Sequence, residues 1–288
     1  MNIKKLTFNS PLYPAILRNI DSPPPQLYVL GDDLEALLKL PRVAIVGTRK
    51  VTPYGTSVTQ RLASELAGQG VVIISGLAYG VDALAHKSAL GAGGLCIGVL
   101  PCPVDNIVPV ANQRLAQRIL DQGGVLVSEY ESGMPPQKQY FIARNRIMSG
   151  LADAVLVTEA GEKSGSLYTS NFAIKQGREL MAVPGNITSP ASVGTNNILK
   201  SFNASAVTNY KDVLNILGLN NHQTKLPNIR GRNRNEQTIL DLLLQGISDG
   251  NQLLDQSKLN ASQFSQVLTM LEIGGKIRPL GLNHWSIV

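Results

Sequence analysis

The chain has 288 residues, of which 43% are hydrophobic, so it can bury one large domain or a medium domain and a small one, and general disorder is excluded. Only two cysteines and three histidines are present, without metal-ligand spacing, which excludes a disulfide framework and leads us to expect no metal and no cofactor. A net charge of +6 permits a polyanionic partner, although many basic proteins have none.

The cellular compartment is indicated by what the sequence lacks. The N-terminus has no apolar signal-peptide core, and no charge-free run of about twenty apolar residues occurs. The few cysteines fit a reducing compartment. We therefore expect a cytoplasmic protein with no membrane contact.

Residues 1–40 are predicted to be a lead-in that packs on the main domain. The stretch from Pro11 to Gly31 is rich in proline and turn residues, so it should be extended, with at most one short helix. Regular structure is expected to begin at Pro41.

From Pro41 onward, short apolar runs rich in β-branched residues alternate with stretches of helical length. The runs are RVAIVG, VVIISG, LCIGVL, GVLVSEY, AVLVTEA and ELMAVPG. This alternation predicts parallel strands buried on both faces and joined by crossover helices. We therefore predict an α/β fold with a Rossmann-like, doubly wound, mostly parallel sheet over residues 41–218.

The remainder is predicted to be a basic linker over 219–234 and a small winged-helix-like domain over 235–288. Three helical patterns, EQTILDLLLQG, GNQLLDQS and NASQFSQVLTMLEIGG, precede two strand-like pieces around Gly281. Three cations against five anions give residues 235–288 a net charge of about −2, which leaves about +8 on the rest of the chain. We infer that phosphates bind the α/β domain and that the small domain serves protein contacts or stability.

Three glycine-containing loops follow predicted strands and open helices: Gly47–Arg49, Ser75–Gly80 and Lys163–Ser166. At such positions helix N-terminal amides bind anions, and glycine allows phosphate to approach the backbone. The alternative is that these glycines only permit tight turns. Neither G-x-x-x-x-G-K-[ST] nor G-x-G-x-x-G is present, which disfavours P-loop and nicotinamide chemistry.

The segment KQYFIARNR at 138–146 places three cations and two aromatic side chains in one loop and helix start. Unpaired nucleic acid is bound by such a combination, because cations track the phosphates and a ring stacks a base. Phe141 would supply the ring. The alternative is that Phe141 and Ile142 enter the core while the two arginines form structural ion pairs, with Asp153 or Glu159 as partners.

Asp82 and His86 lie four residues apart on a predicted helix, so they share a face and could act as an acid–base pair. No serine or cysteine nucleophile accompanies them in a recognisable arrangement. We therefore favour a structural role for both residues.

The same stretches resemble the DNA-processing protein A (DprA/Smf) family, in order and with comparable spacing over most of the chain. The matching segments are YPAILRNIDSPPPQLYVLGD, GTRKVTPYG, SGLAYGVDALAH, SEY…GMPP, FIARNRIMSGLADAVLVTEA, KSGSLYT and AVPGNITSPASVGTNNIL. Three stretches depart from the family pattern, one of them Phe141-Ile142, which stands where the family commonly has F-P before the RNR triplet. The other two are LPCPVDNIVP, which lacks the family's glycines and tyrosine, and Tyr168-Thr169-Ser170, which stands where the family usually has ITA.

The resemblance implies a non-catalytic homodimer that binds single-stranded DNA, protects incoming strands and loads the RecA recombinase onto them in natural transformation and recombination. The DNA-binding residues that it implies are Gly47, Thr48, Arg49, Gly76, Lys138, Phe141, Arg144, Asn145, Arg146, Lys163, Ser164, Gly165 and Ser166.

Two other functions remain open. Related Rossmann-like enzymes process or sense nucleotide derivatives, as phosphoribohydrolases do, but their P-G-G-x-G-T…E signature is absent. A transcription regulator that uses the small domain is disfavoured by the acidic balance of residues 235–288.

Overall fold

The computed structural model describes residues 2–31, 33–201, 204–219, 231–244, 247–281 and 283–287. The chain divides into two compact units, 1–221 and 222–288. Most of the linker expected at 219–234 lies outside the described residues, as does His222.

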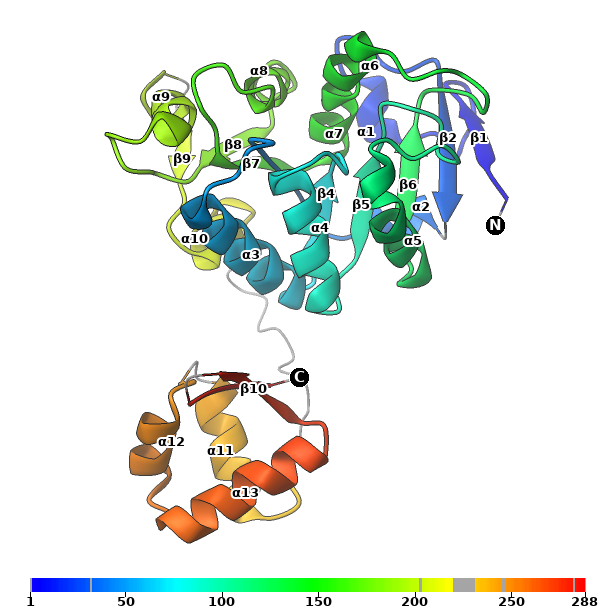
Figure 1. The fold of residues 1–288 in the computed structure, drawn as a ribbon. Helices are drawn as coiled ribbons and strands as arrows, with labels where there is room; N and C mark the ends of the chain where they lie inside the picture. Colours follow the sequence, from blue (N-terminus) through cyan, green and yellow to red (C-terminus); the bar gives the residue numbers. More distant parts are fainter. Residues whose placement is uncertain are drawn as a thin grey trace. The chain divides into compact units, whose positions relative to one another are not determined.

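The first unit is built on a nine-stranded sheet (Figure 1). Its strands are β1 (Lys4–Thr7), β2 (Gln26–Gly31), β3 (Arg42–Gly47), β4 (Val72–Ser75), β5 (Cys96–Val99), β6 (Val125–Ser128), β7 (Ala154–Glu159), β8 (Glu179–Ala182) and β9 (Ser205–Ala206). They lie in the order β1-β2-β6-β5-β4-β3-β7-β8-β9. All pairs from β6 to β9 are parallel, which confirms the Rossmann-like, mostly parallel sheet.

Helices cover both faces of this sheet, because neighbouring residues of the central strands face opposite sides. They are α1 (Ala15–Arg18), α2 (Leu34–Leu37), α3 (Pro53–Gly68), α4 (Val81–Gly91), α5 (Gln113–Asp121), α6 (Lys138–Ala143), α7 (Asn145–Leu151), α8 (Ser166–Lys175), α9 (Val193–Ser201) and α10 (Tyr210–Ile216). In β3, Val43 packs in a core with α3, α4, α5 and α10. Its neighbour Ala44 packs in a second core with α1, α2, α7, α8 and α9.

The expectation that regular structure begins at Pro41 was wrong. Strand β2 pairs antiparallel with β6, and β1 pairs antiparallel with β2, so the lead-in extends the sheet by two strands. The buried run Leu27–Val29 provides the packing for β2. The prolines of this stretch all lie in the connection between β1 and β2, where they remove no hydrogen bond from the sheet.

The second unit contains α11 (Arg234–Leu244), α12 (Gly250–Ser257) and α13 (Ala261–Ile273), followed by the antiparallel strands β10 (Ile277–Gly281) and β11 (His284–Ile287). Leu240, Leu253 and Leu271, one from each helix, meet in its core. Asn260 caps α13 in a reciprocal capping box with Gln263. The winged-helix assignment for this unit stays a prediction.

Within the described ranges, no helix is both long and apolar enough to cross a bilayer. The same residues contain no group of three or more His, Cys, Asp or Glu side chains placed to hold a metal ion.

Candidate functional site

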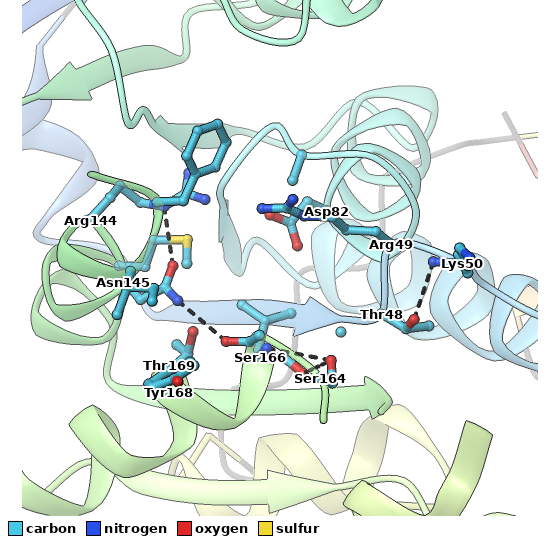
Figure 2. Close-up of a pocket in the computed structure, with 17 residues that line it drawn as sticks. Thr48, Arg49, Lys50, Asp82, Arg144, Asn145, Ser164, Ser166, Tyr168 and Thr169 are labelled. Carbon is cyan, nitrogen blue, oxygen red and sulfur yellow. Dashed lines mark hydrogen bonds between the residues drawn. The ribbon is translucent and has the colours of Figure 1, made fainter. Parts of the chain in front are cut away.

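The sheet reverses its winding direction between β3 and β7. After β3 the chain adds β4, β5 and β6 on one side, whereas β7, β8 and β9 extend the other side. Loops that leave the carboxyl ends of the two central strands therefore diverge and open a crevice, which is where open α/β sheets bind ligands. A pocket of about 360 Å³ lies at this point (Figure 2).

One wall of the pocket is residues 47–50, the end of β3 and the loop that follows it. The Thr48 amide donates to the Glu159 carbonyl at 2.8 Å, and the Thr48 carbonyl accepts from the Val81 amide at 3.1 Å. These bonds tie the loop to β7 and α4. Arg49 and Lys50 are nevertheless exposed, so the loop presents two cations from a fixed backbone.

Two glycines are required by close approaches near this wall. Gly80 has a φ of +76°, and a Cβ there would lie 2.3 Å from the Thr48 carbonyl oxygen. A Cβ on Gly76 would lie 2.3 Å from a guanidinium nitrogen of Arg144. Gly76 therefore makes room for an arginine and does not itself line the pocket.

Arg144 is buried, with 3% of its surface exposed. Its guanidinium donates to the carbonyls of Gly76, at 2.6 Å, and Val99, and to the Asn145 side chain. Burial lowers its pKa to about 10, which leaves it charged at neutral pH. Burial also raises the pKa of Asp82, although the positive charge of Arg144 opposes that shift. Arg144 therefore joins the carboxyl ends of β4 and β5 to α7.

The aromatic ring expected at the site stands beside the expected cation. The Arg49 guanidinium lies over the Phe141 ring, 5.1 Å from its centroid. Helix α6, which carries Phe141, has no buried residue, and Ile142 is 42% exposed. The alternative in which Phe141 and Ile142 enter the core is therefore wrong.

Arg146 does form a structural ion pair, as one alternative proposed, but its partner is neither Asp153 nor Glu159. Arg146 forms a bidentate pair with Glu129, at 2.6 and 2.9 Å, and both side chains are largely buried. The partners considered from sequence are engaged elsewhere: Asp153 pairs with Arg42, and Glu159 accepts from Thr52. Arg146 does not line the pocket.

The opposite wall is the turn Ser164–Ser166, which opens α8. The Ser164 and Ser166 hydroxyls are 2.8 Å apart, and Asn145 reaches the Gly165 carbonyl at 3.5 Å (Figure 2). Hydroxyl groups and helix N-terminal amides at this turn favour an anionic ligand.

Nine of the thirteen residues expected at the site line the pocket. They are Gly47, Thr48, Arg49, Phe141, Arg144, Asn145, Ser164, Gly165 and Ser166. The four that do not line it are Gly76, Lys138, Arg146 and Lys163. Lys138 and Lys163 are exposed on α6 and on the turn before α8. The lining residues that were not among the thirteen expected from sequence are Val46, Lys50, Ala78, Asp82, Ile142, Met148, Tyr168 and Thr169.

His86, which shares a predicted helix face with Asp82, is fully buried on α4. Burial lowers its pKa from 6.5 to about 4. Between these values the unfolded chain binds a proton that the folded chain does not, so stability is lost as the pH falls below 6.5. The full effect is about 3 kcal/mol.

We expect His86→Gln to remove this acid sensitivity. All eight tyrosines lie in residues 1–221 and the single tryptophan, Trp285, lies in the second unit, so near-ultraviolet dichroism of tyrosine reports the first unit alone. Urea unfolding followed in this way gives the free energy of unfolding of each protein. From pH 7.5 to pH 4.5 this free energy should fall more for the wild type than for His86→Gln. If the free energy of unfolding falls equally for the two proteins over this pH range, the lowered pKa of His86 is refuted.

A doubly wound α/β sheet with a cationic pocket at its switch point defines a class of ligand-binding protein suited to phosphate-bearing ligands. The sequence-family model for DNA recombination-mediator protein A matches residues 4–218, and the chain belongs to this DprA/Smf family.

Curated relatives support the assignment. The DNA processing protein DprA of Bacillus subtilis is 38% identical over 225 residues, which is 78% of this chain and 75% of that protein. The protein Smf of Escherichia coli is 42% identical over 214 residues, but the match covers only 56% of its length.

Two solved structures are also similar. The X-ray structure of DprA from Streptococcus pneumoniae matches with a TM-score of 0.68 and 36% identity, over 75% of this chain and 74% of that one. The second, of DNA processing protein A from Helicobacter pylori, is described for its single-stranded DNA binding mode. It matches with a TM-score of 0.67 and 37% identity, over 75% of this chain and 96% of that one.

Proposed function

We propose that the first unit binds single-stranded DNA, without catalysis, along the carboxyl edge of its sheet. The observation that carries the proposal is the pair formed by Arg49 and Phe141, a cation over a half-buried ring at a switch-point pocket. Base stacking on such a ring is independent of sequence, and the cation attracts the phosphate backbone. The DNA-binding mode described for the Helicobacter pylori relative supports this function.

The exposed cations extend beyond the pocket. Lys50, Lys138 and Lys163 stand on the three segments that border or approach it. We assign these three side chains to phosphate contacts. Arg144 and Arg146 hold the site together instead, because their guanidinium groups are occupied by protein acceptors.

Protection of incoming strands, delivery to RecA and action as a homodimer complete the proposal. They are the roles that the family resemblance implies. Light scattering of the purified chain measures the dimer, and RecA filament growth on coated single strands measures the delivery.

A titration with three ligands tests the binding function. Labelled single-stranded oligonucleotide, the matching duplex and free nucleotides are added to the whole chain at two salt concentrations. We expect tight single-strand binding that weakens steeply with salt, weaker duplex binding and no turnover of nucleotides. Preferential binding or hydrolysis of free nucleotides would favour the nucleotide-processing alternative.

Phe141→Ala separates stacking from charge. We expect this variant to bind single strands about five- to a hundredfold more weakly, because a stacked base contributes about 1–3 kcal/mol. The dependence of affinity on salt should stay close to that of the wild type, since no cation is lost. Lys138→Ala, on the same helix, is the matched control and should reduce the salt dependence. Equal salt slopes for both variants would contradict these roles.

A further inference from the structure

Helix α6 carries two of the residues assigned to DNA contacts, Lys138 and Phe141, but it contributes nothing to the hydrophobic core. None of its six residues is buried, and no side chain caps its first turn. The segment before it, residues 131–137, is exposed throughout. Hydrophobic burial therefore does not fix this helix, and its position must depend on particular contacts.

The Tyr140 side chain makes one such contact. Its ring stacks on the ring of Tyr130, with the centroids 3.9 Å apart and the planes at 20°. Tyr140 is half-buried, whereas Tyr130 is 8% exposed and lies two residues beyond the end of β6. Phe141 follows Tyr140 directly in the chain. The stacked pair thus joins the helix that carries Phe141 to the edge of the sheet.

Tyr130 is itself firmly held. Its amide donates to the Ser128 hydroxyl, at the end of β6, at 3.0 Å. The residue before it, Glu129, forms the bidentate pair with Arg146 of α7, and both side chains of that pair are largely buried. Tyr140 therefore stacks on a ring whose backbone is fixed from β6 and from α7. This arrangement also gives a role to Arg146, which was expected at the DNA but does not line the pocket.

We propose that Tyr130 is a positioning residue for DNA binding. By stacking on Tyr140 it holds α6 where Phe141 can reach a base and Lys138 a phosphate, although Tyr130 does not itself line the pocket. Loss of the Tyr130 ring releases both of these side chains together, because they stand on one helix. The inference rests on the proposed single-strand binding and adds to it a residue that acts through α6 and not through contact with DNA.

Tyr130→Ala tests this role through the salt dependence of binding. The substitution removes no charge, so by itself it leaves the number of phosphate contacts unchanged. If α6 is released, however, the phosphate contact of Lys138 is lost together with the stacking of Phe141. We expect affinity for labelled oligothymidylate to fall about tenfold or more, and its salt dependence to fall as it does in Lys138→Ala. Fluorescence anisotropy at several salt concentrations measures both.

Further variants separate positioning from general damage to the fold. Tyr130→Phe keeps the ring and should bind as the wild type does. Tyr140→Ala removes the other member of the stack, from a half-buried position, and should reproduce the effect of Tyr130→Ala. The two tyrosines act as one unit, so the double alanine variant should bind no worse than either single one.

A background that lacks the two DNA contacts decides between the roles. In Lys138→Ala/Phe141→Ala, adding Tyr130→Ala should cause no further loss of affinity, because the contacts that α6 positions are already gone. A further loss in that background, or an unchanged salt slope for Tyr130→Ala alone, would overturn the positioning role while the proposed function stands. If the wild-type chain fails to bind oligothymidylate even at low salt, the proposed function itself is wrong.

Discussion

Arg49→Glu is expected to weaken single-strand binding about a hundredfold at low salt. The substitution removes a charge-assisted contact to phosphate, which contributes about 1.5–3 kcal/mol, and adds a repulsive charge at the pocket. It also removes the cation that lies over Phe141. Fluorescence anisotropy at low and moderate salt measures the effect, and the loss should shrink as salt screens the charge.

The fold should tolerate this change, because Arg49 is exposed and its contact with the ring contributes about 0.5–1 kcal/mol. Arg118→Glu is the matched control. Arg118 is an exposed residue in the last turn of α5, which leads into β6 and so lies toward the opposite edge of the sheet. The control alters the net charge identically and should change affinity by no more than about threefold. Equal losses for the two variants would place the DNA elsewhere.

Arg144→Leu is expected to destabilise the first unit by about 3–5 kcal/mol, the cost of leaving a buried charge without its partner. The substitution leaves the carbonyls of Gly76 and Val99 without their donor, and it removes the cation that most strongly opposes the raised pKa of the buried Asp82 carboxyl. Urea unfolding followed by tyrosine dichroism measures the loss.

A second substitution shows whether the loss has this cause. Adding Asp82→Asn to Arg144→Leu removes the unpaired acid, so the double variant should be more stable than the sum of the two single effects predicts. The loop after β4 should also loosen, because Asp82 accepts from the Gly76 amide at 3.1 Å. Strictly additive effects, or a loss below about 1 kcal/mol for Arg144→Leu, would mean that Arg144 does not organise the site.

The sequence predicts the central sheet and much of the site for one physical reason. Parallel strands direct their carboxyl ends to the same edge, so loops after separate apolar runs must gather there. Residues 47–49 and 164–166 lie more than a hundred positions apart, yet they line one pocket. Phe141 lines the same pocket, because the helix that carries it, α6, has no buried residue and so does not enter the core.

What the sequence does not predict depends on contacts between distant segments. The pair between Arg146 and Glu129 joins a helix to the end of β6, and no local pattern marks it. The burial of Arg144 depends on the missing side chain of Gly76, 68 positions away. The sequence pattern did not indicate β1 and β2, because the prolines between these strands mask the short apolar run of β2.

Tyr168 illustrates a different limit. From sequence, an aromatic residue in a helix is most simply assigned to the core. Only the position of α8, whose first turn borders the pocket, shows that this ring stays exposed.

Photo-crosslinking tests the central claim, that single-stranded DNA lies in the pocket between β3 and β7, most directly. An oligonucleotide with photoreactive thymine analogues is irradiated with the whole chain, and the modified peptides are identified by mass spectrometry. We predict adducts on Phe141 or Tyr168, competed away by unlabelled single strand and reduced by Arg49→Glu. Adducts confined to residues 231–288, with none between 47 and 169, would contradict the account.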